Sequence, residues 1–345
     1  MKRVLAFETS CDDTSVAIIE DPGRVLSCVT ANQDLQHEVF GGVVPEIASR
    51  NHSLNLLPLV DVAFEKAGMT WSDMDGIAVT NRPGLVGSLL VGVMTAKTLS
   101  LAKGLPIIGV NHLEGHLWAP FLSDDSYSLQ QGFPQEYIAL AISGGHTQIY
   151  HVRGLGQYKV LGATLDDAAG EAFDKFAKMT GLGFPGGALV DQYARSGNPK
   201  SFHFPRALMT EDDLRFSFSG LKTAAQRQVE SMTEQQLKDQ IHDLSASYQE
   251  AICEVLVAKL DRAVKSHGIH SVVLTGGVSA NSRLRFLAEQ WAQDEGVNLA
   301  VPPLRYCTDN AAMIGYVGLK RLQLGESSSL DFGPSPRPYE DDFEY

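Results

Sequence analysis

The sequence predicts an α/β protein built from two similar halves, and three observations support this fold class. The chain has 345 residues with 44% hydrophobic content, which is enough to form two ordinary cores. Strand and helix patterns occur twice in the same order along the chain. The spacing from one strand of each half to a set of candidate metal ligands is also nearly the same in both halves.

The first half begins with apolar runs that indicate three strands, of which the first two are separated by the polar turn Thr9–Thr14. A long helix follows, and Pro45 suits its first turn. The elements expected here are the strands Val4–Glu8, Ser15–Ile19, Val25–Ala31, Gly76–Thr80 and Pro106–Val110, and the helices Val44–Lys66 and Leu85–Ala102.

The second half repeats this order, with glycine-containing turns at Ser143–Thr147 and Thr275–Asn281. Its longest expected helix has apolar residues mostly at helical spacing. The elements expected here are the strands Tyr137–Ile142, Gln148–Val152, Ser271–Leu274 and Val297–Val301, the helices Leu244–Lys265 and Ser282–Gln290, and a last helix opened by Cys307–Asn310.

A pair of histidines follows the last strand of the first half. His112 and His116 are four residues apart, so on a helix they share one face and can bind one metal ion; a capped or solvated pair is the alternative. From Ile77 to His112 is 35 residues, and from Val272 to Asp309 is 37. If the two halves face each other across a cleft, these three side chains meet. Two imidazoles and one carboxylate leave coordination positions open for a substrate oxygen, which favours a catalytic metal centre.

A strand pair with a phosphate-sized turn, repeated once, is the plan of the actin, hexokinase and Hsp70 group (the ASKHA, RNase H-like fold), in which a nucleotide lies between the two halves. We expect an N-terminal half at residues 1–125, which carries the histidines. A C-terminal half at 126–330, with an inserted helical segment near 180–240, and an extended tail at 331–345 complete the predicted organisation. The fold alone does not identify the reaction.

Two Gly-Gly turns of the second half each follow a strand. Gly144-Gly145 and Gly276-Gly277 allow close backbone approach, and successive amides in such turns form anion-binding nests. A shared nucleotide is one interpretation, and tight-turn geometry alone is the other. The polar residues beside these turns are Ser143, Thr147, Ser279 and Asn281.

Carboxylates lie between the two turns. Asp167, Glu171 and Asp174 fall on one predicted helical face, and Asp191 follows the turn Gly186-Gly187. At a cleft such groups bind ribose hydroxyls, whereas on an exposed helix they are merely solvated. The neighbouring glycine turn favours sugar contact for Asp174 and Asp191.

Two motif classes are excluded. The chain has no G-x-x-x-x-G-K-[ST] run, which argues against a P-loop enzyme. The run from His112 to His116 is not H-E-x-x-H, because its glutamate follows the first histidine by two positions, so the base of a zincin peptidase is misplaced.

Composition limits the function classes further. A formal charge of −13 argues against nucleic-acid binding by the whole surface, although residues 191–227 hold six basic residues against four acidic ones. That stretch fits either a local RNA contact or a solvated face. The four cysteines lack zinc-ribbon spacing and indicate reduced thiols of a cytoplasmic protein. Cys11 lies in a polar turn, where a reactive thiol is one interpretation and a small turn residue is the one we favour. We expect no signal peptide and no segment of transmembrane length.

Seven motifs occur in order along the chain: Glu8–Thr14, Pro45–Arg50, Asn111–His116, Ser143–Thr147, Asp166–Asp174, Phe216–Lys222 and Thr275–Asn281. Together they resemble the TsaD family (also labelled Gcp or YgjD), the tRNA N6-adenosine threonylcarbamoyltransferases. The resemblance covers nearly the whole chain, and no motif position departs from the family pattern.

The resemblance implies a reaction. Threonylcarbamoyl-adenylate, supplied by a TsaC-like synthase, would donate its threonylcarbamoyl group to the exocyclic N6 amine of the adenosine 3′ to the anticodon in tRNAs reading ANN codons, releasing AMP. It also implies that His112, His116 and Asp309 hold one divalent ion, Fe(2+) with Zn(2+) as the alternative. The adenylate, or ATP or AMP, would be bound by Ile142, Ser143, Gly144, Gly145, His146, Asp174, Gly187, Asp191 and Asn281.

The chemistry needs a proton acceptor, because an adenine amine is a poor nucleophile that loses a proton on attack. Asp12, in the first polar turn, is our candidate. A metal ion can polarise the carbamoyl or phosphate oxygens, and AMP is already a good leaving group.

Partners are expected besides tRNA. The family resemblance implies a TsaB-like paralogue and a TsaE-like ATPase. The helices Val44–Lys66 and Leu85–Ala102 are apolar on several faces, which suits either a partner or internal packing. The competing functions are a metallopeptidase acting on glycoproteins and a non-catalytic ATP-binding scaffold.

Overall fold

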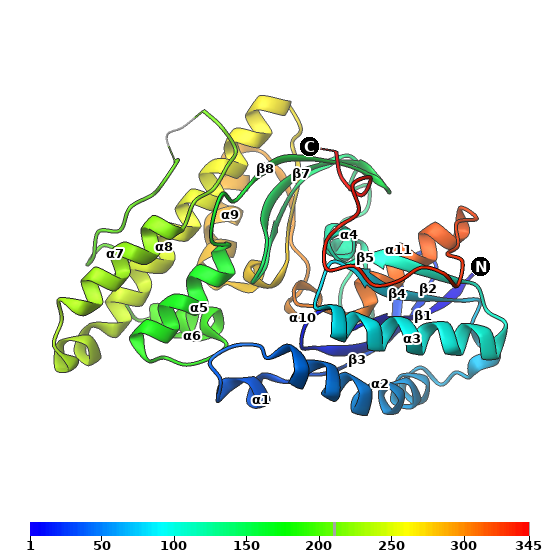
Figure 1. Ribbon diagram of the computed structural model, residues 1–345. Coiled ribbons are helices and arrows are strands. Elements are labelled where there is room, and N and C mark those ends of the chain that lie inside the picture. The colour runs from blue at the N-terminus through cyan, green and yellow to red at the C-terminus, as the bar shows by residue number, and fades with distance from the viewer. Residues whose placement is uncertain (210–211, 345) are drawn as a thin grey trace. The chain divides into compact units, whose positions relative to one another are not determined.

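The computed structural model describes residues 1–209 and 212–344, which form two compact units, each built on its own sheet (Figure 1). Unit 1 comprises Met1–Gly132 together with Pro302–Phe343. Unit 2 comprises Phe133–Val301, to which Glu344 is added. The chain therefore leaves unit 1 after Gly132, returns to it at Pro302 and joins unit 2 again at Glu344.

The sheet of unit 1 has the strand order β3-β2-β1-β4-β5. β1 pairs with β2 and β2 with β3 in antiparallel fashion, whereas β1 with β4 and β4 with β5 are parallel. The strands are β1 (Arg3–Glu8), β2 (Thr14–Glu20), β3 (Arg24–Ala31), β4 (Gly76–Arg82) and β5 (Ile107–Asn111).

The sheet of unit 2 has the same plan, β8-β7-β6-β9-β10, with the same two antiparallel and two parallel pairings. Its strands are β6 (Tyr137–Ile142), β7 (Thr147–Gly154), β8 (Gln157–Ala163), β9 (Ser271–Thr275) and β10 (Asn298–Ala300). The predicted duplicated α/β fold is thus confirmed, and β8 is a strand that the sequence analysis missed.

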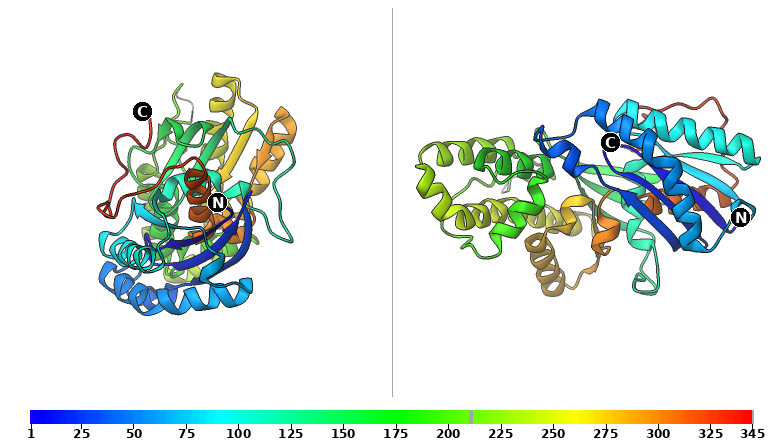
Figure 2. Two further views of the ribbon diagram at one scale, coloured as in Figure 1. Left: turned by 90° about the vertical axis from the view of Figure 1, so that its right-hand side faces the viewer. Right: turned by 90° about the horizontal axis from the view of Figure 1, so that it is seen from below.

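Helices cover both faces of the sheet of unit 1. The long helices α2 and α3 run side by side across one face, and α11 packs on β1, β2 and β4 (Figures 1 and 2). The helical elements of this unit are α1 (Asp34–Glu38), α2 (Pro45–Ala67), η1 (Trp71–Asp73), α3 (Val86–Lys103), α4 (His112–Trp118), η2 (Ala119–Phe121), α10 (Leu304–Cys307) and α11 (Ala311–Gln323).

Side-chain size differs between the two faces of this sheet. Large residues of the strands, such as Phe7 and Ile18, join α2 and α3 in one core cluster. On the other face, a Cβ added to Gly318 of α11 would lie 2.3 Å from the Cβ of Ala78, so the helix backbone approaches β4 very closely. Small residues at this contact therefore dock α11 against the first sheet.

This docking differs from the predicted organisation. The sequence analysis assigned residues 126–330 to the second half, but α11 and the residue before α10, Pro303, belong to unit 1. Of the predicted tail 331–345, residues 331–344 are described and contain no helix or strand, and those up to Phe343 belong to unit 1. The similar spacing of Asp309 and the histidines arises because the two halves repeat one plan. The unit that contains Asp309 is decided instead by the close packing of α11 on the first sheet.

The helices of unit 2 surround one large core. Tyr248 of α8 stacks on Phe176 with ring centroids 4.2 Å apart and donates its hydroxyl to the carbonyl of Ala172 at 3.1 Å. The longest helix begins ten residues before its predicted start, because Thr233 and Gln236 form a capping box. The helical elements are α5 (Ala169–Thr180), α6 (Gly186–Ala194), α7 (Ser219–Glu230), α8 (Glu234–His267), η3 (Gly277–Ala280) and α9 (Ser282–Glu295).

Helix α3 corrects one expectation. With 18 residues, it is the one helix among residues 1–209 and 212–344 that is long and apolar enough to cross a membrane by length and composition. Its residues Leu89, Val93 and Ala96 are buried within unit 1. A core helix passes the same test, so this helix is weak support for a membrane span.

Candidate active site

The two predicted metal ligands of α4 are brought together as the sequence spacing requires. Asn111 ends β5 and caps the helix, because its Oδ1 accepts hydrogen bonds from the amides of Leu113 at 2.8 Å and Glu114 at 3.4 Å. His112 and His116 are then 7% and 1% exposed. Their ring centroids lie 4.7 Å apart in an edge-to-face arrangement.

Asp309 completes the set from the start of α11. Asn310 caps that helix by accepting from the amide of Met313 at 3.0 Å, which fixes the residue before it. Asp309 Oδ1 lies 3.4 Å from His112 Nε2 and 3.2 Å from His116 Nε2. The three ligand atoms lie within 4.8 Å of one another, and all three residues belong to unit 1.

A fully buried carboxylate stands behind the first histidine. Glu8, at the end of β1, lies with its Oε2 3.1 Å from His112 Nδ1. Thr80 Oγ1 also donates to Oε2 at 2.5 Å, and the amide of Ser10 donates to Oε1 at 2.5 Å. A carboxylate that accepts the Nδ1 proton makes Nε2 the ring atom of His112 that can bind a metal ion. Glu8 was predicted to end a strand but was given no role, because no local pattern shows that β1 lies beside β4.

Burial and the charges within this cluster shift the pKa values of its three residues in different directions. Burial alone would lower the pKa of His112, but Asp309 and Glu8 outweigh it and raise that pKa well above its usual value. Burial lowers the pKa of His116. Burial would raise the pKa of Asp309, but the two imidazoles hold it well below its usual value. The carboxylate is therefore ionised at neutral pH, as a metal ligand must be.

These residues fit a divalent cation. Two imidazole nitrogens and a carboxylate oxygen are the donors of many catalytic zinc and non-haem iron sites. The Glu8–His112 pair reproduces the carboxylate–histidine support common around such ligands. A second buried ion pair, between Glu114 of α4 and Arg321 of α11 at 2.7 Å, joins the two ligand-bearing helices.

The first polar turn carries two further carboxylates. Asp13 accepts from Asn32 Nδ2 at 2.9 Å, and burial, with Asp309 and Asp12 nearby, raises the pKa of Asp13 to about 8. Asp12, our sequence candidate for the proton acceptor, lies beside Cys11. Burial raises the pKa of the Cys11 thiol, which agrees with its interpretation as an unreactive turn residue.

The predicted phosphate turn of unit 2 joins β6 to β7. It is closed by the amide of Ser143, which donates to the carbonyl of His146 at 2.8 Å, and it follows directly on Ile142. A Cβ added to Gly144 or Gly145 would meet no atom within 4 Å, so the backbone of this turn is open. That openness suits the close approach of a ligand.

The second Gly-Gly turn follows β9. Gly276 has φ +86°, and a Cβ there would lie 2.4 Å from the carbonyl oxygen of Ile142, so only glycine fits. Gly277 has open space around its Cα. Thus one glycine of this pair is required by packing against β6, and the other leaves the backbone accessible.

The predicted sugar-binding carboxylates have structural partners. Asp174 Oδ1 accepts from the amide of Gly186 at 2.9 Å, beside Gly187. Asp191 is 7% exposed, and its Oδ1 accepts from Ser282 Oγ at 2.6 Å. Asn281 caps α9 and donates from Nδ2 to Gln249 Oε1 at 2.6 Å. These side chains are held in fixed orientations rather than solvated.

A cavity of about 270 Å³ lies beside Asp191 and Asn281, between α6, α8 and α9. Its walls combine apolar surfaces with an amide and an ion pair, in which Arg283 binds Glu250 at 2.5 Å. These residues could not be predicted from sequence, because they come from α6, α8, α9 and the loop after α6. The lining residues are Ala194, Arg195, Gly197, Pro199, Ala246, Gln249, Glu250, Ser282, Arg283 and Phe286.

Most basic residues of 191–227 are neutralised. Four of the six form ion pairs within 4.0 Å, including Lys222 with Asp167 at 3.1 Å. Among the described residues of the chain, Lys200 and Arg227 have no such pair. The predicted acidic residues Asp167 and Glu171 are also neutralised, because both form ion pairs with Lys175. Asp167 does not lie on the predicted helical face, since α5 begins only at Ala169.

Sequence comparison finds one family. Residues 24–316 match the family described as TsaD, tRNA N6-adenosine threonylcarbamoyltransferase. The chain is 61% identical to the tRNA N6-adenosine threonylcarbamoyltransferase of Bdellovibrio bacteriovorus over 343 residues, with 99% of each chain covered. It is 50% identical to that of Anaeromyxobacter dehalogenans over 337 residues, covering 97% of this chain and 99% of the relative.

Solved structures show the same fold at low identity. Component A of the (R)-2-hydroxyglutaryl-CoA dehydratase of Acidaminococcus fermentans matches with a TM-score of 0.54 and 14% identity, over 94% of this chain and 100% of that chain. HypF of T. kodakarensis matches with a TM-score of 0.63 and 11% identity, over 94% of this chain and 48% of that chain.

Proposed function

The chain belongs to the tRNA N6-adenosine threonylcarbamoyltransferase family, and we propose the following reaction for it. The enzyme transfers the threonylcarbamoyl group of threonylcarbamoyl-adenylate to N6 of the adenosine 3′ to the anticodon in tRNAs reading ANN codons. The bond from the carbamoyl carbon to the phosphate oxygen breaks, a bond from that carbon to N6 forms, and AMP leaves. One proton departs from N6.

The observation that carries this proposal is the buried His112–His116–Asp309 cluster with Glu8 behind it. These three residues would hold one divalent ion, Fe(2+) or alternatively Zn(2+). Such an ion would supply Lewis-acid polarisation of the carbamoyl or phosphate oxygens. Glu8 keeps Nε2 of His112 available as a ligand atom by holding the proton on Nδ1.

The adenylate is assigned to unit 2. The open backbone at Gly144, Gly145 and Gly277 suits phosphate oxygens, which need close approach and amide donors. The neighbouring cavity is lined by polar and charged side chains as well as by apolar ones such as Pro199, Ala246 and Phe286, a mixture that suits a nucleoside. Asp174, Gly187, Asp191 and Asn281 remain the residues that we propose to contact the sugar and its surroundings.

The N6 proton is assigned to the first turn of unit 1. Asp12 is the proposed acceptor. Asp13 is the alternative, because its pKa of about 8 lies near neutral pH, where a group can accept and release a proton. Replacing Asp12 or Asp13 by Asn separates the two, since the acceptor's loss should lower the transfer rate at saturating tRNA about 100-fold or more.

The test of the reaction is mass spectrometry of tRNA nucleosides after depletion of the protein, with the loss of threonylcarbamoyladenosine expected. Complementation with the His112→Ala variant should fail to restore the modification, whereas His267→Ala, at an exposed helix end, should restore it. Normal levels of the nucleoside after complete depletion would refute the proposal.

The two competing functions are less well supported. A metallopeptidase needs a base beside the metal, whereas Glu114 is tied to Arg321 in a buried ion pair. A non-catalytic scaffold gives no reason for a buried histidine–carboxylate cluster. Glycoprotein cleavage that disappears in His112→Ala would revive the first alternative.

We propose that the enzyme works with partners: a TsaB-like paralogue, a TsaE-like ATPase, and a TsaC-like synthase that supplies the adenylate. The neighbouring helices α2 and α3 support the first, because each is buried on one face and exposes large apolar residues on another. These exposed residues are Leu54, Leu57, Val62, Val86, Leu90, Met94 and Leu101. Equal multiple-turnover rates with and without the partners would contradict this dependence.

A cytoplasmic location and a protein without a membrane span are part of the same proposal. The substrate, tRNA, is available there, and all four cysteines are free thiols, as expected in a reducing compartment.

A further inference from the structure

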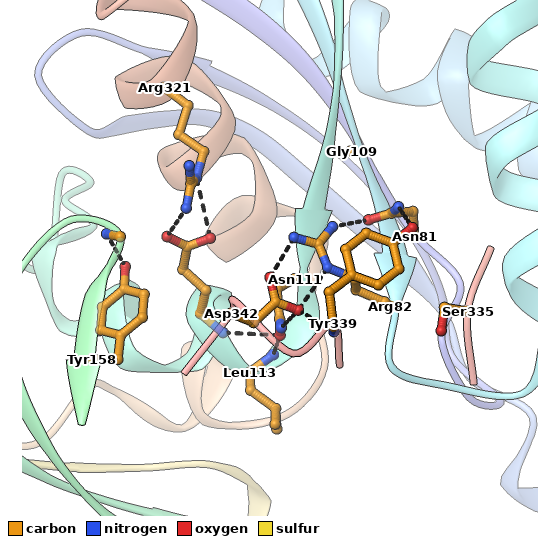
Figure 3. A network of polar contacts seen from close by, with 12 residues as sticks. Asn81, Arg82, Gly109, Asn111, Leu113, Tyr158, Arg321, Ser335, Tyr339 and Asp342 are labelled. Atoms are coloured by element: carbon orange, nitrogen blue, oxygen red, sulfur yellow. Dashed lines mark hydrogen bonds and ion pairs between the residues drawn. The ribbon is translucent and has the colours of Figure 1, made fainter. Parts of the chain in front are cut away.

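The C-terminal segment Gly333–Phe343 follows the end of the β4 and β5 strands in unit 1, where a network of polar contacts holds it (Figure 3). The amide of Ser335 donates to the carbonyl of Asn81 at 2.8 Å. The guanidinium of Arg82 stacks on the ring of Tyr339, with Cζ of Arg82 4.2 Å from the ring centroid. This segment has no helix or strand of its own, so its course is set by these contacts.

Asp342 is the most strongly held residue of the segment. Arg82 binds it through two nitrogens, at 2.5 Å to Oδ1 and 2.7 Å to Oδ2, and the side chains are only 13% and 11% exposed. The amide of Tyr339 donates to Oδ2 at 2.7 Å. Asn111 Nδ2 donates to the same oxygen at 2.9 Å. Asp342 therefore joins the tail to the residue that caps α4.

The contact with Asn111 has a defined consequence for the cap. An asparagine side chain has one acceptor and one donor end, and α4 needs the acceptor to face its first amides. Because Asp342 accepts from Nδ2, it selects the orientation in which Oδ1 faces Leu113 and Glu114. His112 is the first residue of this helix of seven residues, so the cap sets the backbone from which the first ligand projects.

We propose that Asp342 is a positioning residue for the metal centre, acting through the amide of Asn111 on the first turn of α4. The proposal rests on the metal site of the proposed function. The contacts of Asp342 go to Arg82, Asn111 and Tyr339, and its effect on the ligands is to keep His112 directed towards Asp309. The C-terminal segment then helps to position a metal ligand and is not merely a solvated tail.

The test measures binding of Co(2+) to the full-length metal-free chain, by titration followed through the visible absorption of the bound ion. Asp342→Asn should raise the dissociation constant about tenfold, the lower end of the effect of outer groups on metal affinity, because it acts one residue away from the ligand. Hydrogen exchange of the Leu113 and Glu114 amides should accelerate. The matched control is Asp341→Asn, which removes the same charge from an exposed neighbour and should change neither quantity.

A rescue variant separates positioning from general stability. Asn111→Asp places two carboxylates against each other and should weaken Co(2+) binding as well. The double substitution N111D/D342N removes the repulsion between the two carboxylates and keeps an oxygen facing α4. The amino group of the asparagine introduced at position 342 also faces Arg82 Nε and the amide of Tyr339, so we expect the affinity to recover only part of the loss seen in Asn111→Asp. A double variant that binds Co(2+) no better than Asn111→Asp would mean that residues 111 and 342 do not act through one contact, and this would overturn the proposal.

The remaining outcomes are distinct from failure of the proposed function. If wild type binds Co(2+), His112→Ala abolishes it, and Asp342→Asn binds normally, the positioning role is wrong and the metal centre stands. If wild type and His112→Ala behave alike, the metal centre itself is wrong, and the positioning role is refuted with it.

Discussion

Glu8 gives the sharpest prediction about the metal centre, because its substitution by Gln changes which ring nitrogen of His112 carries a proton. Glu8 accepts at both oxygens, from Ser10 on one side and from Thr80 and His112 on the other. A Gln side chain has one oxygen and one amino group. If its oxygen keeps the Ser10 amide, its amino group faces Thr80, whose hydroxyl can turn to accept, and Nδ1 of His112.

The imidazole can also adapt, but only by becoming the acceptor at Nδ1. Its proton then lies on Nε2, where it can donate towards Asp309 Oδ1 at 3.4 Å. Every buried hydrogen-bonding group keeps a partner, but the attraction between Glu8 and a protonated His112 is lost. We therefore expect the metal-free chain to lose about 1–3 kcal/mol of unfolding free energy while remaining folded. Metal binding must first move the proton from Nε2. We therefore expect Glu8→Gln to weaken metal affinity about 10- to 100-fold, equivalent to about 1.4–2.7 kcal/mol.

The assay is a competition titration with Zn(2+) and a chromophoric chelator, with urea unfolding of the metal-free protein in parallel. Glu20→Gln is the control, because it makes the same change at a residue of β2 that pairs with Arg3 at 2.8 Å on the surface. Nitrogen chemical shifts of the imidazole report its tautomer directly. Wild-type Zn(2+) affinity in a folded Glu8→Gln protein would refute the role given to this carboxylate.

Three further predictions follow from single sites. Asp309→Ala should lose bound metal while the fold persists, since its side chain is 27% exposed and faces the two histidines; full occupancy by elemental analysis would contradict the ligand set. Gly145→Val and Gly277→Val should weaken AMP or ATP binding in calorimetric titrations, because the new side chain occupies the space proposed for phosphate oxygens. The unfolding midpoint should change little, since a Cβ at either position meets no protein atom within 4 Å. Gly154→Val is the control, because Gly154 is equally open. Asp166→Ala should cost about 1 kcal/mol at pH 7, because Asp166 supplies the cap of α7 by accepting from the amides of Phe218 at 2.8 Å and Ser219 at 3.2 Å. Burial would raise the pKa of Asp166, but hydrogen bonds from Ser217 and Ser219 hold this pKa below its usual value. The stabilisation by Asp166 is therefore complete above about pH 4 and is lost as the pH falls through the folded-state pKa. A stability difference between wild type and Asp166→Ala that grows on acidification would contradict this prediction.

The fold was predictable where local patterns repeat. β6 was predicted with the bounds that the structure gives it, and β1, β4 and α2 differ by one or two residues at their ends. β8 was missed, since it is an edge strand whose central residues are only partly buried and show no clear alternation. The start of α8 was placed too late, because the polar first turns are stabilised by the Thr233 capping box rather than by an apolar face.

The candidate site was predictable only where sequence neighbours carry it. His112 and His116 share a helix, so their spacing revealed them, and the open glycine turns are local features. Glu8 and Asp13 act through partners distant in sequence, and the contact from Asp342 to Asn111 spans 231 positions. Such contacts depend on strand order and helix docking, which no local pattern encodes.

The position of Asp309 connects the fold to the chemistry. Sequence spacing aligned it with the histidines in a repeat, yet the close docking of α11 on β4 places all three ligands and Glu8 in unit 1. The glycine turns proposed for the phosphates lie in unit 2. Since the metal ligands need nothing from the phosphate turns, Gly145→Val should retain its full metal content while losing nucleotide affinity. Asp309→Ala should show the reverse in the same two assays. A joint loss in either variant would mean that the two parts of the site do not form independently, and the division of roles between the units would have to be abandoned.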